Sequence, residues 1–174
     1  MPAKFTLITQ RLSIEPLVIE DNMFIFELVN TNGWLKFIGN RNITSYEDAI
    51  AYIKRILANE NICYWVVKLK NQNEPIGIIT FIKREYLKHH DIGFAFLPTA
   101  SKKGYAYEAT MAVLEKLITE ESLQHILATT VPENISSIKL LNKIGLIFDR
   151  EIEIDNEKLN VYGTSTDKII SQKP

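Results

Sequence analysis

The chain has 174 residues, of which 46% are hydrophobic and 24% are charged. This length fits one compact domain, residues 1–174, and would be crowded as two. The formal net charge is -1, so the charge balance gives no support to a nucleic-acid-binding or ribosome-binding protein, or to an acidic membrane as partner. Any basic site has to be local.

The amino-terminal stretch and the cysteine content indicate a compartment. The first residues lack the charged-then-apolar pattern of a signal peptide, and no apolar run approaches the ~18 residues of a membrane span. Cys63 is the only cysteine, which excludes an internal disulfide and fits a reducing environment. We therefore expect a cytoplasmic protein with no membrane partner and with Cys63 packed inside a strand.

The spacing of apolar residues changes several times between strand and helix patterns along the first half of the chain. A short strand opens it, followed by a helix for which Asp21 is a candidate N-cap. A second helix is clearer, because Thr44 or Ser45 can cap it and acidic residues follow in its first turn. Three strands come next, the first two joined by a hairpin loop. The opening strand is residues 11–17, and the two helices are residues 19–30 and 44–60. The three later strands are residues 61–70, 74–85 and 89–98.

The second half predicts a helix, a buried strand, a capped helix that ends at Gly145, and a final hairpin. These segments are residues 103–119, 125–131, 134–145 and 146–165. The order of elements indicates an α/β (α+β) domain with a mixed, mostly antiparallel central sheet and helices on both faces.

The stretch "FLPTASKKGYAYEAT", residues 96–110, runs from a strand end into a helix start. Helix N-termini bind anions through unpaired amides, Gly104 lets backbone approach a ligand, and Lys102 and Lys103 add positive charge. The sequence therefore predicts a phosphate-binding loop here. An ordinary connection with solvated lysines fits these residues equally well.

A dinucleotide site is the alternative for the same loop, because Gly104, Ala106 and Ala109 have the spacing of a degenerate G-x-G-x-x-G. In that fold the glycines follow the strand directly and the next strand ends in an acidic residue. Here "PTASKK" intervenes and "HILATTV" ends without an acid. The pattern therefore disfavours a nicotinamide cofactor.

Two longer segments, "DIGFAFLPTASKKGYAYEAT" and "ATTVPENISSIKLLNKIGL", resemble the acetyl-CoA-binding core of the GNAT superfamily of N-acetyltransferases. The branch they resemble is that of RimJ/RimL-type ribosomal-protein N-terminal acetyltransferases. The segments "RLSIEPL" and "FIGNRNITSYEDAIAYI" are similar to that branch as well. The resemblance implies the GNAT fold, acetyl-CoA as cofactor, CoA as product, and an amine-bearing acceptor.

The resemblance also implies a cofactor site. The family signature Q/R-x-x-G-x-G/A is met by Gly104 and Ala106, whereas Ser101 stands where Gln or Arg is usual. By this resemblance, backbone amides of the loop hold the pyrophosphate, and two residues at the end of a splayed strand line the pantetheine and supply an oxyanion donor. The loop residues are Lys102, Lys103, Gly104, Tyr105 and Ala106, and the strand residues are Phe96 and Leu97.

Two residues of "NISSIKLLNKIGL" have candidate roles. Asn134 is an N-cap by its position, and the resemblance adds a hydrogen bond to the pantetheine arm. Ser137 reads from its position alone as a polar surface residue, and the resemblance makes it a candidate proton donor to the leaving thiolate. The tyrosine that many relatives use as general acid falls at Leu141, which cannot donate a proton.

A general base is harder to find. Asp91 begins a strand where some relatives have a catalytic glutamate, and it would need a bridging water because it is shorter. The structural alternative, which the sequence slightly favours, is an exposed aspartate at the strand end. Glu108 fits a partner of the helix dipole better than a base.

No metal site is predicted, because His89 and His90 are adjacent and point to opposite faces of a strand. His125 is most simply structural. The aromatic residues Trp34, Phe37 and Trp65 can line an acceptor cleft, although such residues more often belong to the core.

The function that these residues predict is acetyl transfer to a primary amine by direct attack, without a covalent enzyme intermediate. A protein or peptide amino terminus, an amino acid, a polyamine or another small amine all fit as acceptor. A non-catalytic acyl-CoA-binding or sensing module is the competing class, because Leu141 and the short Asp91 weaken the acid and base set. The sequence leaves open whether the chain is a monomer or a homodimer.

Overall fold

A computed structural model describes residues 5–171 of the chain. These residues form an eight-stranded sheet in the order β1-β2-β3-β4-β5-β6-β8-β7. Neighbouring strands are antiparallel except β5 and β6, which are parallel. The strands are β1 (Leu7–Ile8), β2 (Leu12–Pro16), β3 (Ile62–Leu69), β4 (Glu74–Ile82), β5 (Asp91–Phe96), β6 (His125–Thr130), β7 (Ile147–Ile154) and β8 (Glu157–Ser165).

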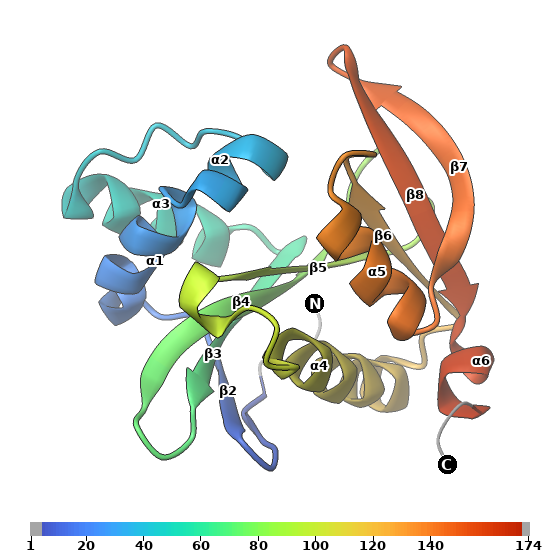
Figure 1. The fold of residues 1–174 in the computed structure, drawn as a ribbon, viewed down its shortest axis with the longest axis horizontal. Coiled ribbons are helices and arrows are strands. Elements are labelled where there is room, and N and C mark those ends of the chain that lie inside the picture. Colours follow the sequence, from blue (N-terminus) through green and yellow to red (C-terminus); the bar gives the residue numbers. More distant parts are fainter. Residues whose placement is uncertain (1–4, 172–174) are drawn as a thin grey trace.

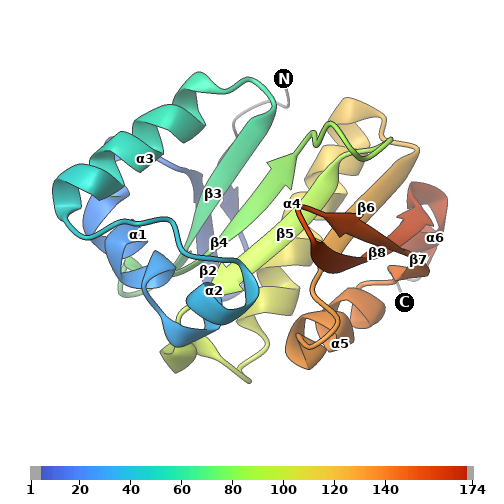
Figure 2. The same ribbon diagram turned by 90° about the horizontal axis from the view of Figure 1, so that it is seen from above.

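Helices cover both faces of this sheet (Figures 1 and 2). In Figure 1, α1, α2 and α3 lie on one side of β4 and β5, and α4 lies on the other. The expected fold class, a mixed and mostly antiparallel sheet between helices, is therefore confirmed. The helices are α1 (Asn22–Val29), α2 (Asn32–Phe37), α3 (Tyr46–Ala58), α4 (Tyr105–Glu121), α5 (Ile135–Lys143) and α6 (Thr166–Ser171), with short 3-10 turns at Ile19–Asp21 and Pro98–Ala100.

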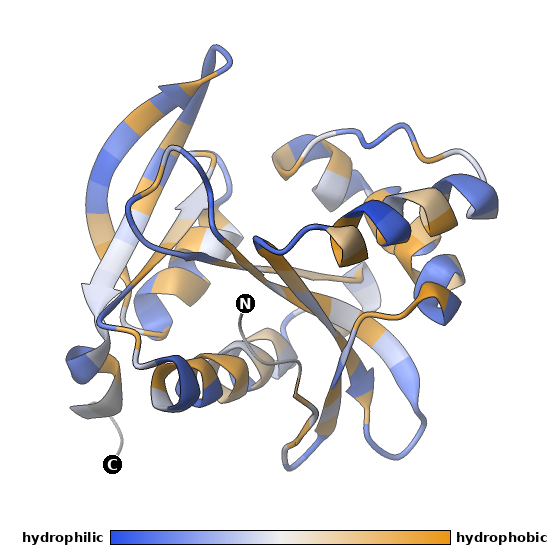
Figure 3. Ribbon diagram, turned by 180° about the vertical axis from the view of Figure 1, so that it is seen from behind, coloured by the Kyte–Doolittle hydropathy of each residue, from blue (hydrophilic) through white to orange (hydrophobic). Residues whose placement is uncertain are grey.

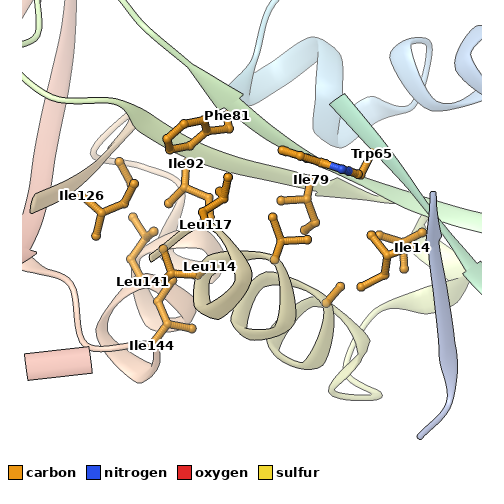
Figure 4. Close-up of a cluster of buried hydrophobic side chains, with 14 of the residues drawn as sticks. Ile14, Trp65, Ile79, Phe81, Ile92, Leu114, Leu117, Ile126, Leu141 and Ile144 are labelled. Carbon is orange, nitrogen blue, oxygen red and sulfur yellow. The ribbon is translucent and has the colours of Figure 1, made fainter. Parts of the chain in front are cut away.

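The two faces of the sheet carry separate hydrophobic cores. In β3, Trp65 and Val67 pack in the core that contains α4, whereas Val66 packs in the core that contains α1 and α3. Figure 4 shows the α4 core, where Leu114 and Leu117 lie beneath side chains of the central strands. Burial on both faces explains why these strands read as nearly continuous apolar runs.

The β7–β8 hairpin differs from the central strands, because much of it is exposed to solvent. Residues 147–151 of β7 are all exposed, Ile147 and Phe148 included, and Figure 3 shows alternating hydrophilic and hydrophobic bands along the hairpin. The hairpin turns at Asp155 and Asn156, which both have positive φ angles, and these residues lie within the segment 146–165 for which the sequence predicts a hairpin.

Several local predictions are confirmed by hydrogen bonds. Ser45 caps α3, since its side chain accepts a hydrogen bond from the Asp48 amide, and Thr44 does not take this role. Asp21 occupies the N-cap position of α1, but its side chain makes no cap hydrogen bond. The sequence missed α2, although the Thr31 side chain caps it through the Trp34 amide, and it also missed the short β1 and α6.

The parallel pair β5 and β6 separates almost as soon as it forms. Its register contains one residue pair, Asp91 with Leu127, next to a hydrogen bond from the Leu127 amide to the His90 carbonyl (3.0 Å). From there the two strands run in clearly different directions (Figure 1). We call the space between the diverging ends of β5 and β6 the opening. Because α4 follows β5 and α5 follows β6, both helices begin at this end of the two parallel strands.

Candidate active site

The loop between β5 and α4 has the backbone of an anion site. Lys102 (φ 60°) and Gly104 (φ 79°) are both in the left-handed region. Gly104 is the N-cap of α4 and has no side chain, so no side-chain oxygen caps the helix. The loop residues 101–104 are exposed. The first amides of α4 are therefore left for a ligand at the positive end of the helix dipole.

The left-handed Gly104 also sets where α4 begins. The sequence predicts a helical start at Lys103, but the helix starts at Tyr105, because a residue with positive φ cannot be part of a right-handed helix. Lys102 and Lys103 therefore lie in the loop, next to the free amides.

A network that the sequence did not reveal ties this loop to the turn between β1 and β2. Glu108, in the first turn of α4, accepts hydrogen bonds from the Thr9 hydroxyl (2.6 Å), the Arg11 amide (3.0 Å) and Arg11 Nε (2.7 Å). Arg11 Nη1 also donates to the Lys103 carbonyl (2.9 Å). Burial acts to raise the pKa of Glu108, but these hydrogen bonds outweigh it and lower that pKa. Glu108 is thus a structural partner rather than a base.

The two residues at the end of β5 differ in whether their backbone amide is free. The Leu97 amide donates to the Ile76 carbonyl of β4 (2.8 Å), so Leu97 has no N–H left for a ligand, contrary to the expectation from sequence. Alternation along an antiparallel ladder then turns the Phe96 amide away from β4, toward the side where β6 has separated. The Phe96 ring lies over Gly77, where an added Cβ would be 2.3 Å from it.

The start of α5 supplies two polar groups at the same end of the opening. The Asn134 side-chain oxygen accepts a hydrogen bond from the Ser137 amide (3.1 Å), which confirms the predicted N-cap. Ser137 is partly buried one turn into the helix. Leu141 is packed in the α4 core with 1% of its surface exposed, so this position offers no proton donor.

Asp91 is buried, not exposed as the sequence slightly favoured. Only 2% of its surface is accessible. Its Oδ2 accepts hydrogen bonds from Arg84 Nε (3.1 Å) and the Thr129 hydroxyl (2.7 Å). Burial raises the pKa of this carboxyl, while the Arg84 charge and the Thr129 hydrogen bond oppose the shift. The sequence predicted neither partner: Arg84 lies in the loop between β4 and β5, and Thr129 lies in β6.

The second oxygen of Asp91 lies near Gly93. A Cβ on Gly93 would lie 3.9 Å from Asp91 Oδ1 and 2.6 Å from the Thr80 hydroxyl. Because Gly93 has no side chain, these two oxygens lie beside open backbone at the point where β5 and β6 separate. Tyr64 on β3 faces Thr80 on β4, and Thr80 faces Gly93 on β5, so two hydroxyl-bearing residues lie side by side next to Gly93.

The aromatic candidates for an acceptor cleft and the cysteine differ in exposure. Trp34, Trp65 and Cys63 are buried in the hydrophobic cores, whereas Phe37 is only partly buried. His90 stacks on Phe81 (4.4 Å between ring centroids).

The other two histidines also stack, His89 on His125 with 4.9 Å between centroids. His125 is exposed at the start of β6 rather than enclosed in the strand. Over residues 5–171, no group of three or more His, Cys, Asp or Glu residues could hold a metal ion. No helix in that range is long and apolar enough to cross a membrane.

Comparisons with known proteins place this geometry in a family. Residues 11–147 match the model of the acetyltransferase (GNAT) domain. The chain is 34% identical over 138 residues to the uncharacterized N-acetyltransferase YnaD of Bacillus subtilis (strain 168), covering 79% of this chain and 80% of that protein.

Solved structures agree with this match. A GNAT-family acetyltransferase from Bacillus anthracis superposes with a TM-score of 0.79 at 26% identity, covering 94% of this chain and 99% of that one. A ribosomal-protein-S5-alanine acetyltransferase from Vibrio fischeri has the same TM-score at 18% identity, covering 98% and 100%. Spermidine N-acetyltransferase from Vibrio cholerae, in complex with CoA and spermine, also has a TM-score of 0.79, at 16% identity, covering 93% and 99%. The chain therefore belongs to the GNAT family of acetyltransferases.

Proposed function

We propose that this acetyltransferase moves the acetyl group of acetyl-CoA directly to a primary amine bound where β5 and β6 separate. The observation that carries the proposal is that free backbone amides, Asp91 and the start of α5 all lie along this one opening. Cys63, the only cysteine, is buried in β3. Direct transfer needs no nucleophilic side chain on the enzyme, which is consistent with the burial of Cys63.

The residues of the loop fit a diphosphate group. The N-terminal amides of α4 lack a side-chain cap, and Gly104 leaves room for close approach. The backbone of residues 102–106 would bind the diphosphate, with Lys102 and Lys103 adding charge. The Phe96 amide and the Asn134 side chain would bind the pantetheine arm. The bound cofactor supplies an activated thioester.

The amine must be neutral before it can attack. An α-amine with a pKa of ~7.7 to 8 costs about 1 kcal/mol to deprotonate at pH 7, whereas a lysine amine of pKa ~10.4 costs about 4.6 kcal/mol. Asp91, through a water held near Oδ1, would accept this proton, and its raised pKa makes it a stronger base than an exposed aspartate. Arg84 and Thr129 would hold the carboxylate in place.

The leaving thiolate needs only modest help, because a free thiol has a pKa near ~8.5. Ser137 would donate a proton to it from the first turn of α5. Leu141 cannot take this part, which gives a specific reason to keep a second hypothesis, a non-catalytic acyl-CoA-binding module.

The acceptor that best fits a weak base is an α-amine. The resemblance to RimJ/RimL-type enzymes suggests a protein or peptide amino terminus, and the Vibrio fischeri structure is named for such a reaction. The spermidine N-acetyltransferase with the same fold makes a small amine or polyamine the alternative acceptor.

Calorimetry with acetyl-CoA, CoA, NAD and ATP tests the cofactor site first. We expect micromolar acetyl-CoA binding, weakened by the double charge reversal Lys102→Glu with Lys103→Glu, and no NAD binding. The matched control reverses two exposed lysines elsewhere, Lys54→Glu with Lys70→Glu, and should leave binding unchanged. If acetyl-CoA does not bind, the proposal fails.

Thiol release in the presence of amine acceptors then separates an enzyme from a binding module. Asp91→Asn and Ser137→Ala should each lower kcat, by roughly 10²- to 10⁴-fold for the base, while acetyl-CoA still binds. Unchanged turnover in both variants would remove these catalytic assignments. Binding without turnover of any peptide, amino acid or polyamine would favour the module.

A further inference from the structure

The diphosphate loop of this chain lacks the side chain that its signature expects. Position 101 holds serine where Gln or Arg is usual, and Ser101 is short and exposed. Lys102 adopts a left-handed φ of 60°, which costs a residue other than glycine conformational energy. Something outside the loop therefore has to hold its backbone in place.

We infer that Arg11, from the turn between β1 and β2, is the positioning residue that holds this loop ready for a diphosphate. The inference rests on the proposed cofactor site. Three contacts of the Arg11 guanidinium carry it: Nε to Glu108 (2.7 Å), Nη1 to the Lys103 carbonyl (2.9 Å), and the plane over the Tyr105 ring at 4.5 Å. They reach the last loop residues and the first turn of α4 together.

The bond to the Lys103 carbonyl sets the direction of the loop backbone. By engaging that oxygen, Arg11 holds the carbonyl on its own side, which favours the opposite direction for the following amides. Gly104 also eases the approach, because a Cβ there would lie 3.3 Å from Arg11 Nη2, a tight contact. The left-handed φ of 79° is the stronger reason for glycine at this position.

Charge gives Arg11 a second effect. Glu108 carries a negative charge in the first turn of α4, where it would repel a bound diphosphate. The ion pair with Arg11 neutralises it, and three donors from Thr9 and Arg11 occupy its oxygens. Removing Arg11 would therefore loosen the loop and leave Glu108 uncompensated at once.

A double-mutant cycle in the full chain separates these two effects. We expect Arg11→Gln to weaken CoA binding by roughly 10- to 100-fold in calorimetry, the range for a lost charge-assisted hydrogen bond. Adding Glu108→Gln should restore part of the lost affinity, because it removes the repulsion between Glu108 and the diphosphate but does not re-order the loop. Lys116→Gln breaks another ion pair of α4, with Glu120, and should leave binding unchanged.

Further readouts exclude a merely structural role. Dephospho-CoA keeps the diphosphate, so Arg11→Gln should weaken the binding of dephospho-CoA by the same factor as the binding of CoA. Once an acceptor is found, KM for acetyl-CoA should rise while kcat stays within about twofold. Arg11→Lys keeps the charge but loses the planar fork, so it should bind CoA with intermediate affinity and serves if Arg11→Gln does not fold.

Failure of this inference is distinguishable from failure of the proposed function. If the unsubstituted chain does not bind CoA, the cofactor site itself is wrong. If it binds CoA and Arg11→Gln, or Arg11→Lys in its place, binds as tightly, the positioning role is overturned. It is overturned equally if the loss appears with CoA but not with dephospho-CoA, or if kcat falls as much as affinity.

Discussion

Replacing Arg84 by glutamine tests whether the buried carboxylate of Asp91 depends on its partner. The Arg84 side chain is 32% exposed and that of Asp91 only 3%, so the substitution leaves behind the more deeply buried group of the pair. Removing one partner of a buried pair typically costs 3–5 kcal/mol. The Asp91 carboxyl can take up a proton instead of staying charged and unpaired. Protonating a carboxyl with a pKa of ~3.9 at pH 7 costs about 4 kcal/mol, at 1.36 kcal/mol for each unit between pKa and pH, and this cost sets the upper limit of the penalty.

We therefore expect Arg84→Gln to lose about 3 kcal/mol of unfolding free energy at pH 7, a fall in Tm of about 6–12 °C for a domain of this size. The loss should shrink toward acidic pH. The folded pKa of Asp91 is already raised by burial, and without Arg84 it rises further, so the folded state binds the extra proton above ~3.9. At pH 5 the limit falls to about 1.5 kcal/mol.

The same shift has a kinetic signature if Asp91 is the base. The acidic limb of kcat/KM against pH should move to higher pH in Arg84→Gln, because the carboxylate ionises later. Urea unfolding at pH 5 and pH 7 and a pH–rate profile measure the two effects. Arg150→Gln is the control, since Arg150 forms an exposed pair with Asp149 of the kind worth ~1 kcal/mol or less. A loss of stability independent of pH would contradict the role given to Asp91 protonation, and an unshifted pH–rate profile would contradict its assignment as the base.

Three further predictions follow from single contacts. Gly77→Ala places a Cβ 2.3 Å from the Phe96 ring, so it should cost about 1–3 kcal/mol and weaken acetyl-CoA binding; urea unfolding and calorimetry would both have to be unchanged to contradict this. Ser45→Ala removes the cap oxygen that accepts the Asp48 amide and should cost about 1 kcal/mol in thermal unfolding, with an unchanged Tm counting against the cap. Glu108 has a lowered pKa, so its contribution to stability is present above its unfolded pKa of ~4.3 and is lost as pH falls through the lower folded value; Glu108→Gln should remove this part of the acid destabilisation between pH 6 and pH 3, and an identical pH dependence in the variant would argue against it.

Much of the fold could be predicted because its signals are local. A cap or a turn is decided within a few residues of chain. Ser45, Asn134 and the left-handed Gly145 are therefore found at the helix ends that the sequence predicts. The family signature around Gly104 is local in the same sense, since consecutive backbone groups make the phosphate-binding loop.

The chemistry of the site depended on contacts that no local pattern contains. Arg11 reaches Glu108 across 97 positions of the sequence, and Thr129 reaches Asp91 across 38. The Leu97 amide is taken by a neighbouring strand, which sequence spacing does not show.

Local signals in the sequence were therefore sufficient for the order of the main elements, for the caps at Ser45 and Asn134, and for the family resemblance. Three features depend on tertiary contacts: the burial of Asp91, the contact of Arg11 with Glu108, and the free amide at Phe96 rather than Leu97. The physical reason is that strand pairing and its register bring distant residues together, and that register is settled by the packing of the whole sheet.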